Sequence, residues 1–312
     1  MSKKILITGA NGFMGRNLVN SLVQSDNEIF AFVYPNAKTD FTFPFAKNLH
    51  IISCDLNDIF DYENIIPNNI SVMYHLAWHG VSPELRNDLD AQIVNIPLSL
   101  KCMDFAAKKK IRKVIFPGST NEYLFYGKPL NKNAVPTPKD AYGSTKVALR
   151  YLCEQFAAQH GIEFIYTIIA GIYAADRRDN NVIFYTIDKL LHKEKPSLTK
   201  LEQLWDYVYI DDVVEALIVI GEKGKNGSTY AIGHGDNWPL SNYINIIHQK
   251  IDPLLPLGIG EVPYKEQRMP CSCIDLTDLT QDTGFMPKVN FDEGISKVIE
   301  KIRFEIGEVQ NG

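Results

Sequence analysis

The chain has 312 residues, which is enough for one large α/β unit or two smaller domains. Hydrophobic residues make up 45% and charged residues 22%, as in a globular protein that buries a core, and the net charge of −5 argues against a nucleic-acid partner. No apolar run approaches the ~20 residues that a membrane-spanning helix needs, and no secretory leader precedes the first apolar run. We therefore expect a cytoplasmic protein without a membrane or nucleic-acid partner.

Short apolar runs alternate with helical patterns through the first half of the chain. The apolar runs, which predict buried strands, cover residues 5–7, 28–33, 51–52, 72–76, 114–116 and 164–169. Apolar residues recur at helical spacing over 16–24, 98–107 and 145–158. This alternation predicts an α/β fold with a doubly wound parallel sheet and right-handed crossovers.

The pattern becomes less regular after Tyr173, where a polar stretch is followed by a region rich in turns and prolines. A strand over 207–210 and a helix over 211–221 are expected to return to the main sheet. We predict a dinucleotide-binding domain over 1–173, joined by 205–235. Residues 174–204 and 236–312 are predicted to form a smaller C-terminal substrate-binding cap.

A glycine-rich loop follows the first strand and opens the first helix. Residues 8–15 read Thr-Gly-Ala-Asn-Gly-Phe-Met-Gly. Gly9 permits a tight turn, Gly12 lets the backbone approach a pyrophosphate, and Gly15 lets the helix pack close to the strand. The free N–H groups at the start of the helix then face the phosphates. The loop predicts a bound dinucleotide.

The same spacing, Gly-x-x-Gly-x-x-Gly after a threonine, resembles the extended short-chain dehydrogenase/reductase family of nucleotide-sugar epimerases and dehydratases. The resemblance runs over nearly the whole chain and implies a Rossmann-type fold. Asp55-Leu56 resembles the family's adenine-contacting pair, His75-Leu76-Ala77 its cofactor-lining segment, and Val94-Asn95 a pair on the following helix. The implied cofactor-binding residues are Gly9, Asn11, Gly12, Phe13, Met14, Gly15, Arg16, Tyr34, Asp55, Leu56, Leu76, Ala77, Asn95, Tyr142 and Lys146.

Tyr34 stands at the end of the second predicted strand, where an acid usually selects NAD by binding its ribose. Without that carboxylate a 2′-phosphate is tolerated, and Arg16 or Lys38 could pair with it. We therefore expect NADP(H) to be favoured over NAD(H).

Tyr142 and Lys146 lie four residues apart on a predicted helix, so both side chains share one face. A nearby ammonium favours the phenolate and brings a phenol of pKa near 10 into a useful range. The resembling family uses this tyrosine to exchange a proton with a sugar hydroxyl or keto group, and the lysine to hold the nicotinamide ribose. Tyr142 and Lys146 are therefore predicted to be catalytic.

The third catalytic member is expected at the end of the fifth strand. Residues 116–123 resemble the family's Ser-Ser-x-x-Val-Tyr segment, whose second serine corresponds to Ser119, with Thr120 as the alternative if the register shifts by one. Both are predicted to contact substrate. The family's 4,6-dehydratases carry Thr-Asp-Glu here, but the two acid positions are Thr120 and Asn121 in this chain, and a shifted register restores only Glu122. Dehydration is therefore disfavoured.

Two family positions that contact substrate are changed. Gly171 stands where an asparagine is usual, and Trp205 replaces an arginine that reaches the substrate diphosphate. Arg268 resembles the family's second diphosphate-binding arginine and is the predicted substrate cation, with Arg177 and Arg178 as further candidates.

These features predict a nucleotide-sugar oxidoreductase, first of all a 4-keto-6-deoxyhexose reductase acting on a nucleoside-diphosphate sugar. A 4-epimerase on the same scaffold is the alternative, and a 4,6-dehydratase or a non-catalytic dinucleotide sensor is less favoured. The resemblance leaves a homodimer open. No metal site is expected, because His75 and His79, although four residues apart, fall at the end of a strand.

Overall fold

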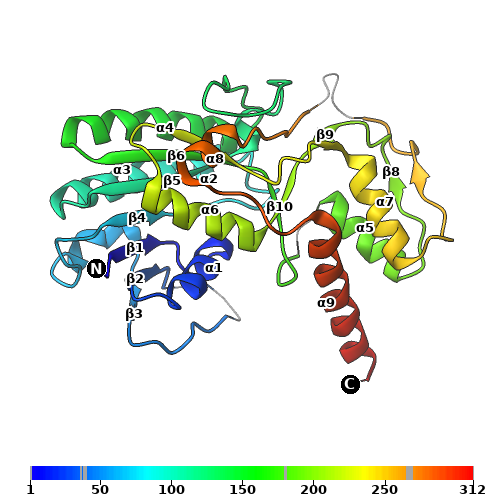
Figure 1. Ribbon diagram of the computed structural model, residues 1–312, viewed down its shortest axis with the longest axis horizontal. Helices are drawn as coiled ribbons and strands as arrows, with labels where there is room; N and C mark the ends of the chain where they lie inside the picture. Colours follow the sequence, from blue (N-terminus) through cyan, green and yellow to red (C-terminus); the bar gives the residue numbers. More distant parts are fainter. Residues whose placement is uncertain (1, 36, 38–40, 179–180, 265–269, 312) are drawn as a thin grey trace.

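A computed structural model describes residues 2–35, 37, 41–178, 181–264 and 270–311 (Figure 1). Its main sheet has seven parallel strands in the order β11-β6-β5-β4-β1-β2-β3. These strands are β1 (Lys4–Thr8), β2 (Glu28–Val33), β3 (Leu49–Ser53), β4 (Val72–His75), β5 (Lys113–Ser119), β6 (Glu163–Ile169) and β11 (Thr229–Ile232). The order reverses between β1 and β4, which is the point where ligands bind in sheets of this kind. The predicted Rossmann-type fold and all six predicted strands of the first half are confirmed.

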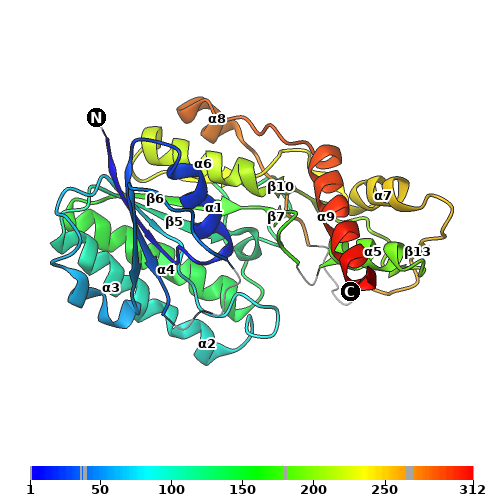
Figure 2. The same cartoon turned by 90° about the horizontal axis from the view of Figure 1, so that it is seen from below.

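Helices cover both faces of the sheet, as the apolar strands require (Figure 2). On one face lie α1 (Phe13–Leu22), α6 (Ile210–Lys223) and α8 (Thr277–Thr283). On the other lie α2 (Leu89–Ile93), α3 (Asn95–Lys108) and α4 (Ala141–His160). α1 begins three residues earlier than its apolar pattern predicts, because Gly12 caps the helix and Gly15 belongs to its first turn.

The predicted strand over 207–210 does not enter the main sheet. β10 (Tyr207–Tyr209) pairs instead with β7 (Gly171–Tyr173) in a separate two-stranded parallel sheet. β11 is the strand that joins the main sheet, beside β6. The chain leaves the main sheet after Ala170, whose N–H still donates to Ile232, whereas the N–H of Gly171 donates to Asp206. β10 thus lies beyond the carboxyl edge of the sheet.

The C-terminal cap is built around α5 (Val182–Leu191), α7 (Leu240–Ile251) and α9 (Phe291–Asn311), with α7 packed between the other two. Short strand pairs complete it: β8 (Ser197–Leu198) with β13 (Gly258–Ile259), and β9 (Leu204–Trp205) with β12 (Trp238–Pro239). Rings of Tyr173, Tyr207, Tyr243 and Phe291 join β7 and β10 to the cap. α8, in contrast, packs on α6 and β11, although its residues fall in the predicted cap segment.

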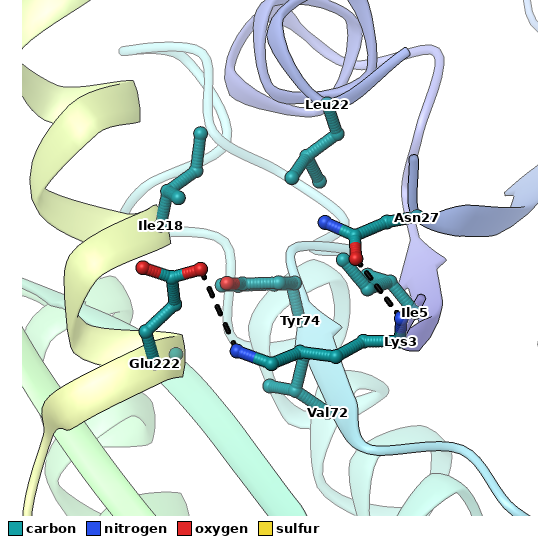
Figure 3. A pocket seen from close by; sticks show the side chains of 9 residues that line it. Lys3, Ile5, Leu22, Asn27, Val72, Tyr74, Ile218 and Glu222 are labelled. Carbon is teal, nitrogen blue, oxygen red and sulfur yellow. Dashed lines mark hydrogen bonds and ion pairs between the residues drawn. The ribbon is translucent and has the colours of Figure 1, made fainter. Parts of the chain in front are cut away.

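A small pocket lies at the amino ends of β1 and β4, opposite the edge that carries the glycine loop (Figure 3). Lys3 and Glu222 form an ion pair across it at 3.5 Å, and the Lys3 N–H donates to Asn27. In the part of the chain that the structure describes, no helix combines the length and apolarity needed to cross a membrane.

Candidate active site

The glycine loop connects β1 to α1 at the carboxyl edge of the sheet. Gly9 has a φ of +68°, and a Cβ added there would lie 2.6 Å from the backbone nitrogen of Ala77. A Cβ at Gly15 would lie 2.2 Å from the carbonyl oxygen of Gly9. Both positions therefore require glycine, so that the loop can stay close to β4 and to the start of α1. The backbone N–H groups at the start of α1 remain directed toward the loop opening, which fits a pyrophosphate.

The other predicted cofactor residues lie along the same edge. The Asn11 side chain bridges the loop to the end of β2, accepting from the Tyr34 N–H at 3.3 Å and donating to the Tyr34 carbonyl at 3.4 Å. Leu76 and Ala77 follow β4 beside Gly9, and Asn95 begins α3, where its side chain is bonded to the backbone of His79. The structure thus gathers the predicted set around one edge, although it leaves the role of each residue a prediction.

Asp55 has a local structural role as well. Its carboxylate accepts from the Asn57 N–H at 2.9 Å and so caps the 3-10 turn Leu56–Tyr62 after β3. This bond fixes the Asp55-Leu56 backbone at the end of β3, where the resemblance places the adenine.

The Arg16 guanidinium does not point freely toward a 2′-phosphate. It forms an ion pair with Asp176 at 2.8 Å and packs against the rings of Phe13 and Phe41. The Arg177 guanidinium also packs on Phe13, 4.3 Å from the ring centroid. The loop after β7 is therefore tied to the first turn of α1. Lys38, the second predicted phosphate cation, lies outside the described residues.

The predicted catalytic residues come together at the carboxyl end of β5. Ser119 is the last residue of β5, and its hydroxyl lies near enough to the Tyr142 phenol to lower the pKa of that phenol. Lys146, one turn further along α4, donates to the Pro117 carbonyl at 2.8 Å and is nearly fully buried. Asp140 caps α4 through the Gly143 N–H at 2.7 Å and thereby fixes the start of the helix. The structure therefore places Ser119, Tyr142 and Lys146 close together, as their positions in the sequence predict.

The protonation states of the pair differ from the sequence expectation. Burial, with Glu122 as the second cause, raises the pKa of Tyr142 to about 12. Burial likewise lowers the pKa of Lys146 to about 7, against the opposing influence of Glu122. The expected lowering of the Tyr142 pKa by Lys146 is therefore not found: the pKa is raised, and the nearby cation that opposes the rise is Arg86. Tyr142 stays protonated at neutral pH, as a proton donor should.

Trp78 and Arg86 complete the surroundings of Tyr142 and were not found from the sequence. The Lys146 ammonium lies 3.8 Å from the centroid of the Trp78 ring, and the same indole meets the Tyr142 ring edge-on at 5.7 Å. The Arg86 guanidinium lies over the Tyr142 ring, 5.6 Å from its centroid. The backbone carbonyl of Arg86 accepts a hydrogen bond from the Tyr142 N–H. The only signal for Trp78 was its position directly after the cofactor-lining segment 75–77.

Glu122 lies beneath this group with no exposed surface. It ends the 3-10 turn Thr120–Glu122, and its carboxylate accepts from the Ser119 N–H at 2.6 Å and from the Tyr166 hydroxyl at 2.8 Å. Thr120, the alternative to Ser119, is buried in the same turn, whereas Ser119 is partly exposed. This arrangement favours Ser119 as the residue that faces substrate.

On the substrate side, the two changed family positions are neighbours. A Cβ added at Gly171 would lie 2.8 Å from the Tyr207 ring and 3.3 Å from the Trp205 indole nitrogen. Trp205 is half-buried, and its backbone bridges β12 and Ser272. It therefore stands at the junction of β7 and the cap. Arg178 pairs with Glu305 of α9 at 2.5 Å, and Arg268 lies outside the described residues.

His75 is buried and has a structural role. Its ring nitrogens are bonded to the hydroxyls of Thr8 and Ser99 at 2.8 and 3.0 Å, and burial lowers its pKa to about 3. The described residues contain no group of three or more His, Cys, Asp or Glu side chains that could hold a metal ion.

Known proteins resemble this chain along its whole length. It is 24% identical to a putative UDP-glucose 4-epimerase of Methanocaldococcus jannaschii over 95% of this chain and 97% of that protein. It is 23% identical to a dTDP-4-dehydro-6-deoxyglucose reductase of Escherichia coli over 96% and 97% of the two chains. Among solved structures, the UDP-glucose 4-epimerase of Thermotoga maritima with UDP-glucose superposes with a TM-score of 0.83 at 21% identity, covering 97% and 99% of the two chains. That likeness shows a shared fold.

A family model decides the assignment. The model described as the NAD dependent epimerase/dehydratase family matches residues 5–233, which include the glycine loop, Ser119, Tyr142 and Lys146. The edge of the sheet that these residues occupy is the one where the fold binds its ligands. From the glycine loop to β11, then, the sequence and the geometry lead to one result: this chain is an enzyme of the NAD dependent epimerase/dehydratase family.

Proposed function

We propose that the protein is an NADP(H)-dependent reductase acting on the 4-keto group of a 6-deoxyhexose attached to a nucleoside diphosphate. The observation that carries this proposal is the protonated Tyr142 phenol, held beside the Ser119 hydroxyl at the carboxyl end of β5. Reduction of a carbonyl needs a proton donor at the carbonyl oxygen, and a phenol whose pKa is raised to about 12 keeps its proton at neutral pH. One curated relative is named a dTDP-4-dehydro-6-deoxyglucose reductase, which supports the same choice.

The residues of the chain fit a dinucleotide. Gly9 and Gly15 let the loop lie directly against Ala77 and the start of α1, and α1 directs its N-terminus at the loop. Gly12, Asn11, Leu76, Ala77 and Lys146 would hold the cofactor, which supplies a hydride when bound. Tyr142 donates its proton to the carbonyl oxygen of the sugar, and Ser119 orients that oxygen by a hydrogen bond. Lys146 binds the ribose, and its charge stabilises the phenolate that remains after Tyr142 has given up its proton.

The preference for NADP(H) rests on the end of β2 and the start of α1. Tyr34 is half exposed there and brings no carboxylate to repel a 2′-phosphate. Arg16 lies in α1 just after the glycine loop, and within the described residues its buried Nε has no hydrogen-bond partner. Solved structures of similar fold carry NAD, so both cofactors belong in the test.

A 4-epimerase is the second candidate, because it would need the same three side chains and one similar structure is a UDP-glucose 4-epimerase with UDP-glucose. Dehydration is disfavoured by Glu122. Its carboxyl group is fully buried and bonded to Ser119 and Tyr166, so it cannot reach a substrate as the acid of an elimination.

The test is incubation of the purified protein with a panel of CDP-, dTDP-, GDP- and UDP-linked sugars, including 4-keto-6-deoxy forms. NADPH absorbance and the sugar products are followed together. Stoichiometric loss of NADPH with formation of a 4-hydroxy sugar is the expected result. Isomer formation without net loss would establish the epimerase, and cofactor binding without any turnover would favour a sensor.

A further inference from the structure

Glu122 is a buried acid that the proposed chemistry does not use. It occupies the position where the family segment Ser-Ser-x-x-Val-Tyr has valine, and it has no exposed surface. Burying a carboxyl group is costly unless hydrogen bonds and opposite charge compensate. Glu122 has both kinds of compensation, and each leads to the active site.

The hydrogen bonds lead to Ser119. The Ser119 N–H donates to one carboxylate oxygen at 2.6 Å, while the Ser119 hydroxyl accepts from the Asn121 N–H at 3.2 Å. Together these two bonds form a capping box that closes the turn at the end of β5. The Tyr166 hydroxyl on β6 donates to the same carboxylate and lies 2.9 and 2.8 Å from its two oxygens. The carboxylate therefore fixes the direction in which Ser119 leaves the sheet.

The charges lead to Lys146. Two cations of α4, Lys146 and Arg150, act on Glu122 and favour its ionised form. Arg150 already pairs with Glu154 at 3.0 Å and donates to Tyr123 and Thr229. Lys146 donates to the Pro117 carbonyl, and its ammonium otherwise lies over the rings of Trp78, Phe116 and Tyr142. Glu122 is the acid whose charge supports the ammonium of Lys146.

We propose that Glu122 is a positioning residue of the active site, which fixes Ser119 through its backbone and supplies the buried counter-charge of Lys146. The proposal rests on the function proposed above only in using its catalytic residues. Above its pKa of about 7, Glu122 is ionised, and its charge then raises the pKa of both Lys146 and Tyr142, which favours the charged lysine and the protonated phenol together. This is the state that a proton donor with a charged neighbour requires.

Glu122→Gln is the decisive variant, because the amide oxygen can still accept from Ser119 while the charge is gone. Loss of the charge lowers the pKa of Lys146 and of Tyr142 together. The basic limb of the kcat–pH profile should therefore move down by about half a pH unit or more, with KM changed less than about twofold. Glu154→Gln is the matched control: it removes a carboxylate beside Arg150 on α4 without contacting Ser119, and its profile should equal that of the wild type.

A Glu122→Gln profile identical to the wild type would overturn the proposal. If this variant does not fold, Tyr166→Phe replaces it. The Tyr166 hydroxyl lowers the pKa of Glu122, so its removal favours the neutral acid and should move the same limb in the same direction. A Tyr166→Phe profile that stays in place would likewise overturn the counter-charge role.

Thermal unfolding supplies a readout that needs no substrate. Burial raises the pKa of Glu122 from 4.5 to about 7, so the folded protein holds a proton there that the unfolded chain releases. Its contribution to stability is complete below pH 4.5 and is lost as the pH rises through 7. Between pH 5 and 8 the Tm of Glu122→Gln should therefore fall less than that of the wild type. If this Tm difference is seen in a protein that shows no turnover, the role of Glu122 is supported and the reductase is rejected. If the protein turns over the keto sugar but shows no Tm difference, the reductase is supported and the role of Glu122 is rejected.

Discussion

The neighbours of Tyr142 include the Ser119 hydroxyl, the cations Lys146 and Arg86 and the Glu122 carboxylate, which come from four different segments of the chain. Ser119 ends β5, Glu122 ends the 3-10 turn after it, Lys146 lies on α4, and Arg86 precedes α2. The Ser119 hydroxyl lowers the pKa of the phenol, but burial has the strongest single effect and raises it. A side chain in this setting releases its proton only to a strong base, such as the developing alkoxide of a reduced ketone.

Replacement of Tyr142 by phenylalanine keeps the ring against Trp78 and removes the proton donor. We expect kcat to fall by ~10²–10⁴, with the cofactor Kd unchanged, because only the transition state uses the hydroxyl. Steady-state kinetics and calorimetry measure the two quantities. Tyr151→Phe is the control, since Tyr151 lies on the same helix and is half exposed. More than about a tenth of wild-type kcat in Tyr142→Phe would contradict the role.

Replacement of Tyr34 by aspartate places a carboxylate where the resembling family selects NAD. It should repel a 2′-phosphate, so the expected order of affinity, NADPH above NADH, should reverse in the variant. Tyr34→Phe keeps the ring without the charge and should retain the wild-type order. Calorimetry measures the Kd of each protein for NADPH and for NADH. Tighter binding of NADH than of NADPH by the wild type would refute the NADP(H) preference.

At the scale of elements, the substrate side depends on how β7 and β9 approach each other. Gly171 opens β7 next to the Tyr207 ring of β10, and the Trp205 indole of β9 closes the same space. The family's asparagine at position 171 would not fit beside this tryptophan without a shift of both rings. The two departures from the family pattern are therefore one change in packing, which replaces an amide and a cation by an apolar surface.

Gly171→Ala should reveal this packing. The added methyl would lie 2.8 Å from the Tyr207 ring, so rings in a filled core must move. We expect a loss of about 1–3 kcal/mol in the free energy of unfolding, seen as a lower Tm. Gly307→Ala in α9 is the control, because a Cβ there meets no atom within 4 Å. Equal Tm values for the two variants would show that position 171 has room for a side chain.

At the scale of the whole molecule, the loop after β7 connects the cap to the cofactor side. Asp176 binds Arg16 at the start of α1, Arg177 packs on Phe13, and Arg178 binds Glu305 on α9. Three consecutive residues thus join the glycine loop to the C-terminal helix. A cofactor phosphate near Arg16 would compete with the Asp176 carboxylate for the same guanidinium.

Asp176→Asn should therefore strengthen NADPH binding several-fold and leave NADH binding unchanged, because only NADPH brings the additional phosphate. The Tm without cofactor should change little, since an exposed ion pair contributes about 0–1 kcal/mol. Asp188→Asn, which removes an exposed acid from α5, should alter neither affinity. Weaker NADPH binding by Asp176→Asn would place the 2′-phosphate away from Arg16.

The sequence was sufficient for features that depend on near neighbours in the chain. The glycine loop, the strands of the first half and the shared face of Tyr142 and Lys146 follow from local spacing, because backbone geometry fixes which residues adjoin at short separation. The position of Ser119 could also be predicted, since it ends a strand whose carboxyl edge carries the site. The start of α1 and the pairing of β10 were missed, because a helix cap and a strand partner depend on distant backbone groups.

Only the tertiary structure placed Trp78, Arg86 and Glu122 around Tyr142, and only it joined Gly171 to Trp205. These residues are far apart in the chain, and no periodicity relates them. The pKa of Tyr142 likewise required the fold, because burial outweighs the neighbouring cations once water is excluded. Local spacing determines which groups can act together, and the desolvation created by packing decides which of them carries the proton.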